Sequence, residues 1–184
     1  MRLLRYSVAW GALLLAPSGL PAATLTTTQT LTAVISPEGG FFSLTSNVSL
    51  TKNGSIFTNF TSSPVAIQYC ARTTQSTGGG NITVKATADF SPSGGPSIAS
   101  PPSTGDGLTY TCSTATLGQA CTNTPTVSTT TAMNVVAFAP SECSSSTCGS
   151  SNRNTVTVTF YLTDDPKYNT GSYSATLTFT ISAT

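Results

Sequence analysis

Apolar and polar residues alternate along most of the chain after its first 23 residues. The alternation is clearest near the C-terminus, where Ser and Thr separate the apolar residues Tyr173, Ala175, Leu177, Phe179 and Ile181. A period of two places the apolar residues on one face of a β-strand and the hydroxyl residues on the other. The pattern therefore predicts a closing strand with one buried face and one face in water.

Further segments show the same alternation or a short apolar run. The strongest are Ile82–Phe90 and Val156–Leu162. The weaker candidates are Leu25–Ile35, Phe42–Leu50, Ile56–Phe60, Val65–Ala71, Leu108–Cys112 and Met133–Ala139. Met133–Ala139 is apolar on both faces, which favours a central strand covered on both sides. Because no helical period is found, we expect an all-β fold, a single Ig-like antiparallel β-sandwich.

Turn-forming residues separate these candidate strands. Lys52-Asn53-Gly54-Ser55 predicts a hairpin turn, because Asn and Gly both accept a positive φ. Ser91–Gly107 carries several Pro and Gly residues and is interpreted as a long surface loop. Asp89 falls on the polar side of its strand, so we expect its carboxylate to be solvated.

The N-terminus has the three parts of a secretory signal. Met1–Arg5 is basic, Val8–Ala16 is a short apolar stretch, and Pro17–Pro21 leads to the small residues Ala22 and Ala23. We therefore expect a signal peptide over 1–23 and a β-sandwich domain over 24–184. No stretch of the mature chain is long and apolar enough to predict a membrane span. The predicted location is the periplasm, the cell surface or the extracellular space.

Five cysteines fit an oxidising compartment, where disulfides persist. Proximity in the sequence favours the pairs Cys112–Cys121 and Cys143–Cys148, each closing a short loop. Cys70 would then be the odd thiol, buried as a small apolar residue or replacing one of these partners. We expect structural disulfides, because no second pair of ligands completes a metal site.

The composition excludes several classes of function. Only 7% of the residues are charged and the formal net charge is +1, which argues against an electrostatic nucleic-acid binder. The chain has no histidine, so it has no Ser-His-Asp triad, Cys-His pair or His-based zinc site. Asp164 and Asp165 are adjacent, and facing carboxylates for glycoside hydrolysis are not evident. We expect no enzyme activity, no cofactor and no metal, although the Asp164-Asp165 loop would also suit calcium.

The segment that follows the signal, Thr24–Ile35, is an extended alternating arm. Its apolar positions are Leu25, Leu31, Ala33 and Ile35. Such an arm can add as a strand to a neighbouring subunit, with backbone hydrogen bonds giving affinity and apolar side chains filling pockets. The other interpretation is that the arm is the first strand of its own domain.

The ending Gly171-Ser172-Tyr173 followed by the alternating strand through Ile181 resembles the closing strand of the spore coat protein U family and related chaperone–usher pilin subunits. The signal peptide, the arm and the small size are similar too. The resemblance implies an Ig-like sandwich, export to the periplasm and assembly into surface fibres with the help of a chaperone and usher. The five cysteines and the long loop at Ser91–Gly107 depart from that family.

The function expected from the sequence is that of an exported structural or adhesive surface protein, a fimbrial subunit that assembles by β-strand exchange. The alternative is a monomeric secreted binding module for carbohydrate or another surface ligand. A sugar site would need an exposed aromatic residue, and Tyr161 and Tyr168 are the candidates.

Overall fold

The computed structural model describes residues 28–145 and 148–184. Residues 35–184 form one compact unit, which contains all of the described strands. The predicted signal peptide and Leu25 lie outside the described residues. The strands are β1 (Glu38–Leu44), β2 (Leu50–Lys52), β3 (Phe60–Ser62), β4 (Val65–Arg72), β5 (Gly80–Ser91), β6 (Thr109–Cys112), β7 (Gln119–Ala120), β8 (Met133–Phe138), β9 (Asn154–Leu162) and β10 (Ser174–Ala183).

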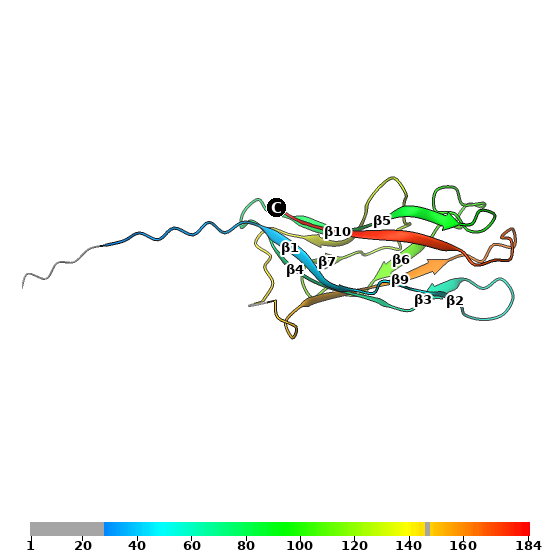
Figure 1. Ribbon diagram of the computed structural model, residues 1–184, viewed down its shortest axis with the longest axis horizontal. Coiled ribbons are helices and arrows are strands. Elements are labelled where there is room, and N and C mark those ends of the chain that lie inside the picture. Colours follow the sequence, from blue (N-terminus) through cyan, green and yellow to red (C-terminus); the bar gives the residue numbers. More distant parts are fainter. Residues whose placement is uncertain (1–27, 146–147) are drawn as a thin grey trace, which may run out of the picture. The chain divides into compact units, whose positions relative to one another are not determined.

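The first sheet is built around β9 (Figure 1). On one side β9 pairs with β3 and then β4, and on its other side it pairs with β6. β2 pairs with β3, and β1 pairs with β4, so β1 and β2 together form one edge of this sheet. All of these pairings are antiparallel, as expected for strands with one wet face.

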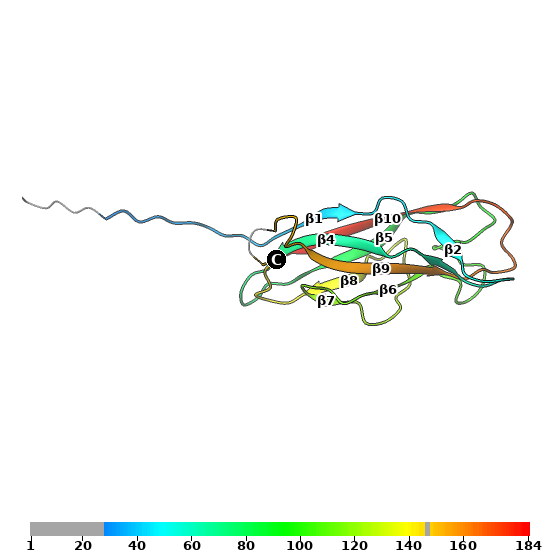
Figure 2. The same cartoon turned by 90° about the horizontal axis from the view of Figure 1, so that it is seen from below.

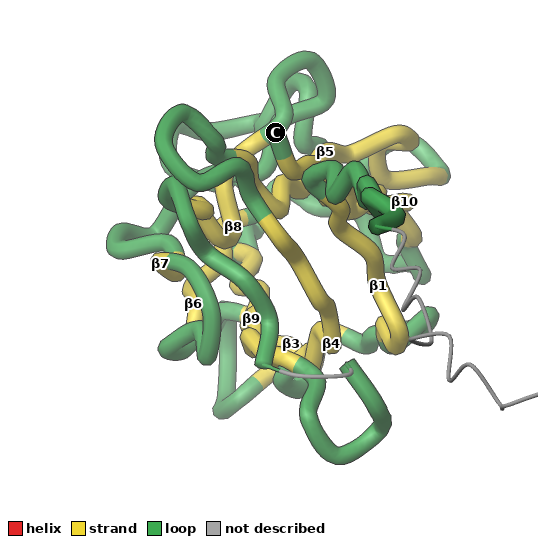
Figure 3. The backbone as a smooth tube through the Cα atoms, turned by 90° about the vertical axis from the view of Figure 1, so that its left-hand side faces the viewer, coloured by secondary structure: helices red, strands yellow, loops and turns green. Residues whose placement is uncertain are grey.

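The second sheet has the order β10-β5-β8-β7 and is also antiparallel. The two sheets form two layers, which Figures 2 and 3 show from the side and from one end. β1, at the edge of the first sheet, lies next to β10, at the edge of the second (Figure 3). The predicted Ig-like antiparallel β-sandwich is confirmed for the described residues.

The core lies between the two sheets and follows the alternation of the sequence. Buried and less buried residues alternate along β4, β9 and the first half of β5. The largest fully buried side chains are Tyr69, Tyr110, Ile67 and Ile82. The Tyr110 hydroxyl donates to the Asn134 carbonyl at 2.6 Å, and the Tyr69 hydroxyl donates to the Leu117 carbonyl. Both phenols are therefore satisfied in the core, as buried tyrosines require.

Four of the predicted strands differ from the structure, and one of them, Phe42–Leu50, is interrupted at residues 45–49. Residues 28–35 of the predicted strand Leu25–Ile35 lie in no strand. The predicted strand Ile56–Phe60 is mostly loop, and β3 begins only at Phe60. Met133–Ala139 is central, between β5 and β7, but Asn134 and Ala137 are exposed, so the strand is not covered on both faces.

The disulfides confirm one predicted pair and overturn the other. Cys112–Cys121 is formed, but Cys148 bonds to Cys70 rather than to Cys143, across a sequence separation of 78 residues. Cys143 is the free thiol, and it is exposed. The reason is that the backbone at Cys143 forms a bridge with Arg72 at the end of β4. Cys70 therefore takes its partner from a later part of the same loop.

Candidate functional site

The described part of the N-terminal arm presents apolar side chains to water. Leu31 is 90% exposed and Ile35 is 72% exposed, and Ala33 between them is also exposed. Residues 28–37 form no strand, so the interpretation of the arm as the first strand of its own domain is not borne out for these residues. Val34, on the other face of the segment, is 89% exposed. An isolated apolar residue on a surface is ordinary, but several on one short segment without a strand partner are a ready surface for strand pairing.

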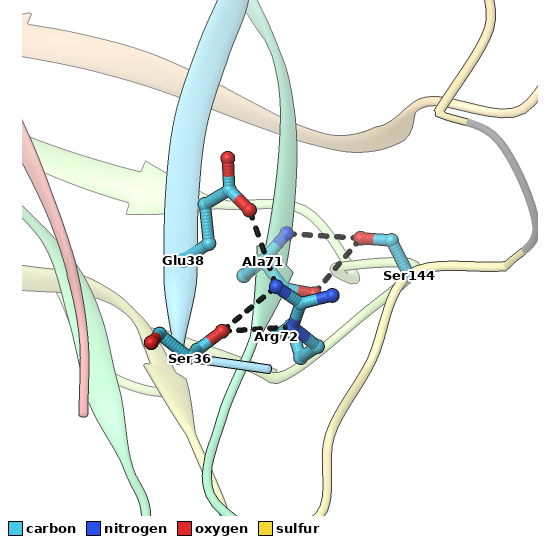
Figure 4. Close-up of polar contacts among 5 residues, drawn as sticks. All are labelled: Ser36, Glu38, Ala71, Arg72 and Ser144. Carbon is cyan, nitrogen blue, oxygen red and sulfur yellow. Dashed lines mark hydrogen bonds and ion pairs between the residues drawn. The ribbon is translucent and has the colours of Figure 1, made fainter. Parts of the chain in front are cut away.

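Arg72 fixes the point where the arm meets the sandwich (Figure 4). Its Nε and Nη2 atoms donate to the Ser36 carbonyl at 3.0 and 2.7 Å, and Nη2 also lies 3.2 Å from the Glu38 carboxylate. Next to it, Ser144 Oγ accepts from the Ala71 N–H at 2.9 Å and donates to the Ala71 carbonyl at 3.1 Å. β4 is thus tied to the start of β1 on one side and to the later loop on the other.

β1 and β10 each end a sheet, so one backbone edge of each has no strand partner in the described ranges. The two edges touch at one end, where a Cβ added to Gly39 would lie 3.1 Å from the Cγ1 atom of Ile181. At the other end they separate, because residues 45–49 leave the sheet between β1 and β2. The predicted strand Phe42–Leu50 is therefore interrupted, and the interruption opens the side of the sandwich.

A groove of about 470 Å³ occupies this opening. Its floor includes the core residues Val65, Leu108 and Phe160, and its two walls are residues 45–50 and residues 172–177. The predicted closing-strand residues Tyr173, Ala175 and Leu177 line the second wall. Val48 in the first wall is 39% exposed, and Phe42 and Leu44 on the adjoining β1, which do not line the groove, are 48% and 38% exposed. The open edge therefore combines unpaired backbone with apolar side chains.

The remaining closing-strand residues, Phe179 and Ile181, pack against the core nearer the closed end. The apolar positions of β10 are all half-buried, and the Ser and Thr positions between them are exposed. The predicted alternation of this strand is therefore confirmed.

Tyr173 stands between two glycines at the rim of the groove. A Cβ added to Gly95 would lie 2.3 Å from its ring, and one added to Gly171 would lie 3.3 Å from it. The Tyr173 hydroxyl donates to the Asn169 carbonyl at 2.7 Å. The Gly-x-Tyr sequence therefore has a packing reason, because the ring lies over the backbone at positions that have no side chain.

The carboxylates of Asp89 and Asp164 are held by hydrogen bonds and an ion pair within the fold. Asp89 accepts hydrogen bonds from the N–H groups of Phe90, Ile98 and Ala99 and from the Ser97 hydroxyl, so the expectation that it is solvated is wrong. Burial raises the pKa of Asp89, but these hydrogen bonds, led by that of Ile98, outweigh it and hold the pKa below its ordinary value. Asp164 pairs with Lys52 at 2.5 Å.

Within the described ranges no three His, Cys, Asp or Glu side chains gather as a metal site would require. The same residues include no helix that is long and apolar enough to cross a membrane. Tyr161 and Tyr168, considered for sugar binding, are half-buried and do not line the groove.

Sequence reasoning missed Arg72 and the wall formed by residues 45–49. The one signal for that wall is the polar run Thr45-Ser46-Asn47, which breaks the alternation of the strand around it. No sequence signal connects Arg72 with Ser36, because the contact depends on the pairing of β1 with β4.

Comparisons with family models, with curated proteins and with solved structures find no match to this chain. The resemblance to spore coat protein U and to chaperone–usher pilins therefore stays a prediction.

Proposed function

We propose that this chain is an exported structural subunit of a surface fibre that assembles with copies of itself by β-strand exchange. In this proposal the arm, residues 24–35, of one copy occupies the open edge between β1 and β10 of the next. The observation that carries it is the presence in one chain of exposed apolar residues in the described part of the arm and of a groove with an apolar floor, between two sheet edges that have no strand partner in the described ranges. Strand addition accounts for both the arm and the groove, because it pairs the free backbone of the sheet edges and covers the apolar side chains.

The geometry favours a head-to-tail arrangement. The arm leaves the sandwich at Ser36, at the end of β1 where the two edges touch, and the groove opens at the other end of β1. A donor site and an acceptor site that lie at different places on one subunit give a heterologous contact, which propagates as a filament unless it closes into a ring. The two disulfides support an oxidising compartment such as the periplasm or the cell surface. A periplasmic chaperone and an usher are the partners that this assembly would use.

The test separates the donor from the acceptor. The full chain, exported and purified without reductant, is expected to form multimers by light scattering, and deletion of 24–35 should leave stable monomers. Leu31→Asp with Ile35→Asp should act like the deletion, whereas Thr30→Asp with Thr32→Asp, on the other face of the arm, is the charge-matched control and should still assemble.

A mixing experiment then tests the acceptor. Val48→Asp places a charge in the groove wall and should also give monomers when alone. Its arm is intact, so an equimolar mixture with the Leu31→Asp/Ile35→Asp variant should form heterodimers and nothing larger. Polymers that persist without the arm, or a mixture that stays monomeric while both variants are folded, would contradict strand exchange.

The second candidate is a monomeric binding module for carbohydrate. It is favoured by the ring of Tyr173 at the groove rim and by the hydroxyl and amide groups of Thr45, Ser46 and Asn47 in the opposite wall. Sugars combine stacking on an aromatic ring with hydrogen bonds to such groups. Binding on a glycan array that is lost in Tyr173→Ala, with a wild-type chain that remains monomeric, would favour this function over the first.

A further inference from the structure

Two loops at one end of the sandwich meet around a pair of buried carboxyl groups. Asp106, near the end of the long loop between β5 and β6, is 5% exposed. Asp165, in the loop between β9 and β10, is 8% exposed. A buried carboxylate is costly unless it is paired or hydrogen-bonded, and two of them side by side repel each other.

Asp165 is well provided with donors. The Lys167 N–H donates to its Oδ1 atom at 2.7 Å and the Ser103 hydroxyl donates to its Oδ2 atom at 2.7 Å. Asp106 is not, because its Oδ2 atom is buried and has no hydrogen-bond partner. Its backbone N–H donates to the Ser103 carbonyl at 3.2 Å, which holds the two acids on either side of the same serine.

The charged and titratable groups around Asp106 and Asp165 offset only part of the repulsion between the two carboxylates. Lys167 Nζ reaches the Ser103 hydroxyl at 2.9 Å, and Asp164, which adds negative charge, is paired with Lys52. The Tyr168 hydroxyl is buried without a partner. Burial, and after it the charges of Asp106, Asp165 and Asp164, raises the pKa of Tyr168 to about 12, so the phenol keeps its proton.

The pKa values of the two acids are shifted in opposite directions. Burial, and then the hydrogen bond and charge of Asp165, raises the pKa of Asp106 above its ordinary value. The hydrogen bonds from the Lys167 N–H and the Ser103 hydroxyl lower the pKa of Asp165. One acid is therefore disposed to keep a proton and the other to accept a hydrogen bond from it.

We propose that Asp106 and Asp165 form a carboxylic acid–carboxylate pair whose single proton joins residues 103–107 to residues 163–168, and that loss of this proton loosens the two loops from each other. A shared proton explains why Asp106 Oδ2 lacks a donor, since in the protonated acid this atom is itself the donor. A bound cation is less favoured, because among the described residues no third His, Cys, Asp or Glu side chain gathers with these two as a metal site would require.

The two loops that hold Asp106 and Asp165 are followed in the sequence by residues that line the groove. A change of pH that affects the pair would therefore also affect the groove. Leu108, two residues after Asp106, lies in the groove floor, and Ser172 and Tyr173, which follow the second loop, lie in its wall. Loosening of these loops at higher pH should therefore widen or disorder this end of the groove. The inference does not depend on what occupies the groove.

The direct test is a carbon-13 NMR titration of the aspartate Cγ atoms in the full chain, from pH 3 to pH 9. Asp106 is expected to titrate above the ordinary value of about 3.9 and Asp165 below it. A single-step titration of both groups near the ordinary value would overturn the proposal.

Unfolding measurements provide the second readout. The wild-type free energy of unfolding should fall as pH rises through the range in which Asp106 ionises. Asp106→Asn, which keeps an N–H donor for Asp165, should remove that fall, and the charge-matched control Asp164→Asn should retain it. If calcium chloride raises the unfolding midpoint of the wild type at pH 7 and Asp106→Asn abolishes the effect, a cation rather than a proton holds the pair and the proposal is wrong.

Discussion

Arg72 donates two hydrogen bonds to the backbone carbonyl of Ser36, from Nε at 3.0 Å and from Nη2 at 2.7 Å. The planar guanidinium makes this two-point contact possible, and a lysine could make only one. The contact fixes the last residues before β1, and so it fixes where the N-terminal arm leaves the sandwich. For strand exchange this matters because a donor segment binds better when its point of attachment is preorganised.

Arg72→Lys should therefore loosen the base of the arm without unfolding the domain. Because the side chain is 44% exposed, we expect a loss of stability of only about 0.5 kcal/mol. Hydrogen exchange at residues 36–40 should speed up, whereas exchange in β9 should stay the same. Unchanged protection at residues 36–40 would show that the guanidinium does not hold this segment.

The two disulfides should differ in their contribution to stability. Cys70–Cys148 closes a loop of 78 residues and Cys112–Cys121 a loop of 9. Loop-closure entropy gives about 4.5 kcal/mol for the first and about 2.6 kcal/mol for the second. Urea unfolding of the double Cys→Ala variants should show this order, with Cys143→Ser as a control of unchanged stability. The order would be contradicted if loss of Cys112–Cys121 cost more.

Asp89 should make folding dependent on acid pH. Its folded pKa is lowered, so its contribution to stability is present above the unfolded value of about 3.9 and is lost as pH falls through the folded value. Asp89→Ala leaves the donors of the 97–99 loop without their acceptor and should cost about 2 kcal/mol at pH 7. Asp89→Asn should flatten the acid limb of the stability curve below pH 4. An Asp89→Asn curve that matches the wild type there would contradict this role.

The glycines around Tyr173 should tolerate alanine unequally. Gly95→Ala places a Cβ 2.3 Å from the Tyr173 ring, so the ring must move, and overpacking of this kind costs about 1–3 kcal/mol. Gly171→Ala, at 3.3 Å, should cost less, and Gly40→Ala, with nothing within 4 Å, should leave the ring in place. Urea unfolding gives the order, and the ring protons of Tyr173 should shift in the NMR spectrum only for the first two. Equal costs for Gly95→Ala and Gly40→Ala would refute the packing argument.

The alternation of apolar and polar residues predicted where the long strands lie but not where a strand is interrupted by a loop. Val156–Leu162 and Ile82–Phe90 are predicted to within two residues at each end, because one buried face imposes a period of two. Phe42–Leu50 is predicted as one strand and is interrupted at 45–49, because hydroxyl and amide side chains suit both a wet strand face and a loop. The alternation of apolar and polar residues therefore does not predict the groove wall formed by residues 45–49.

The sequence by itself determined the all-β class and the one-sided burial of the strands, because each depends on residues within a few positions of one another. Proximity in the sequence was right for Cys112–Cys121 and wrong for Cys143–Cys148. Only the tertiary structure decided that Cys70 bonds to Cys148, that Arg72 holds Ser36 and that Ser103 donates to Asp165. The physical reason is that these contacts join segments tens of residues apart. They exist only once strand order and register have brought those segments together, and local alternation carries no information about either.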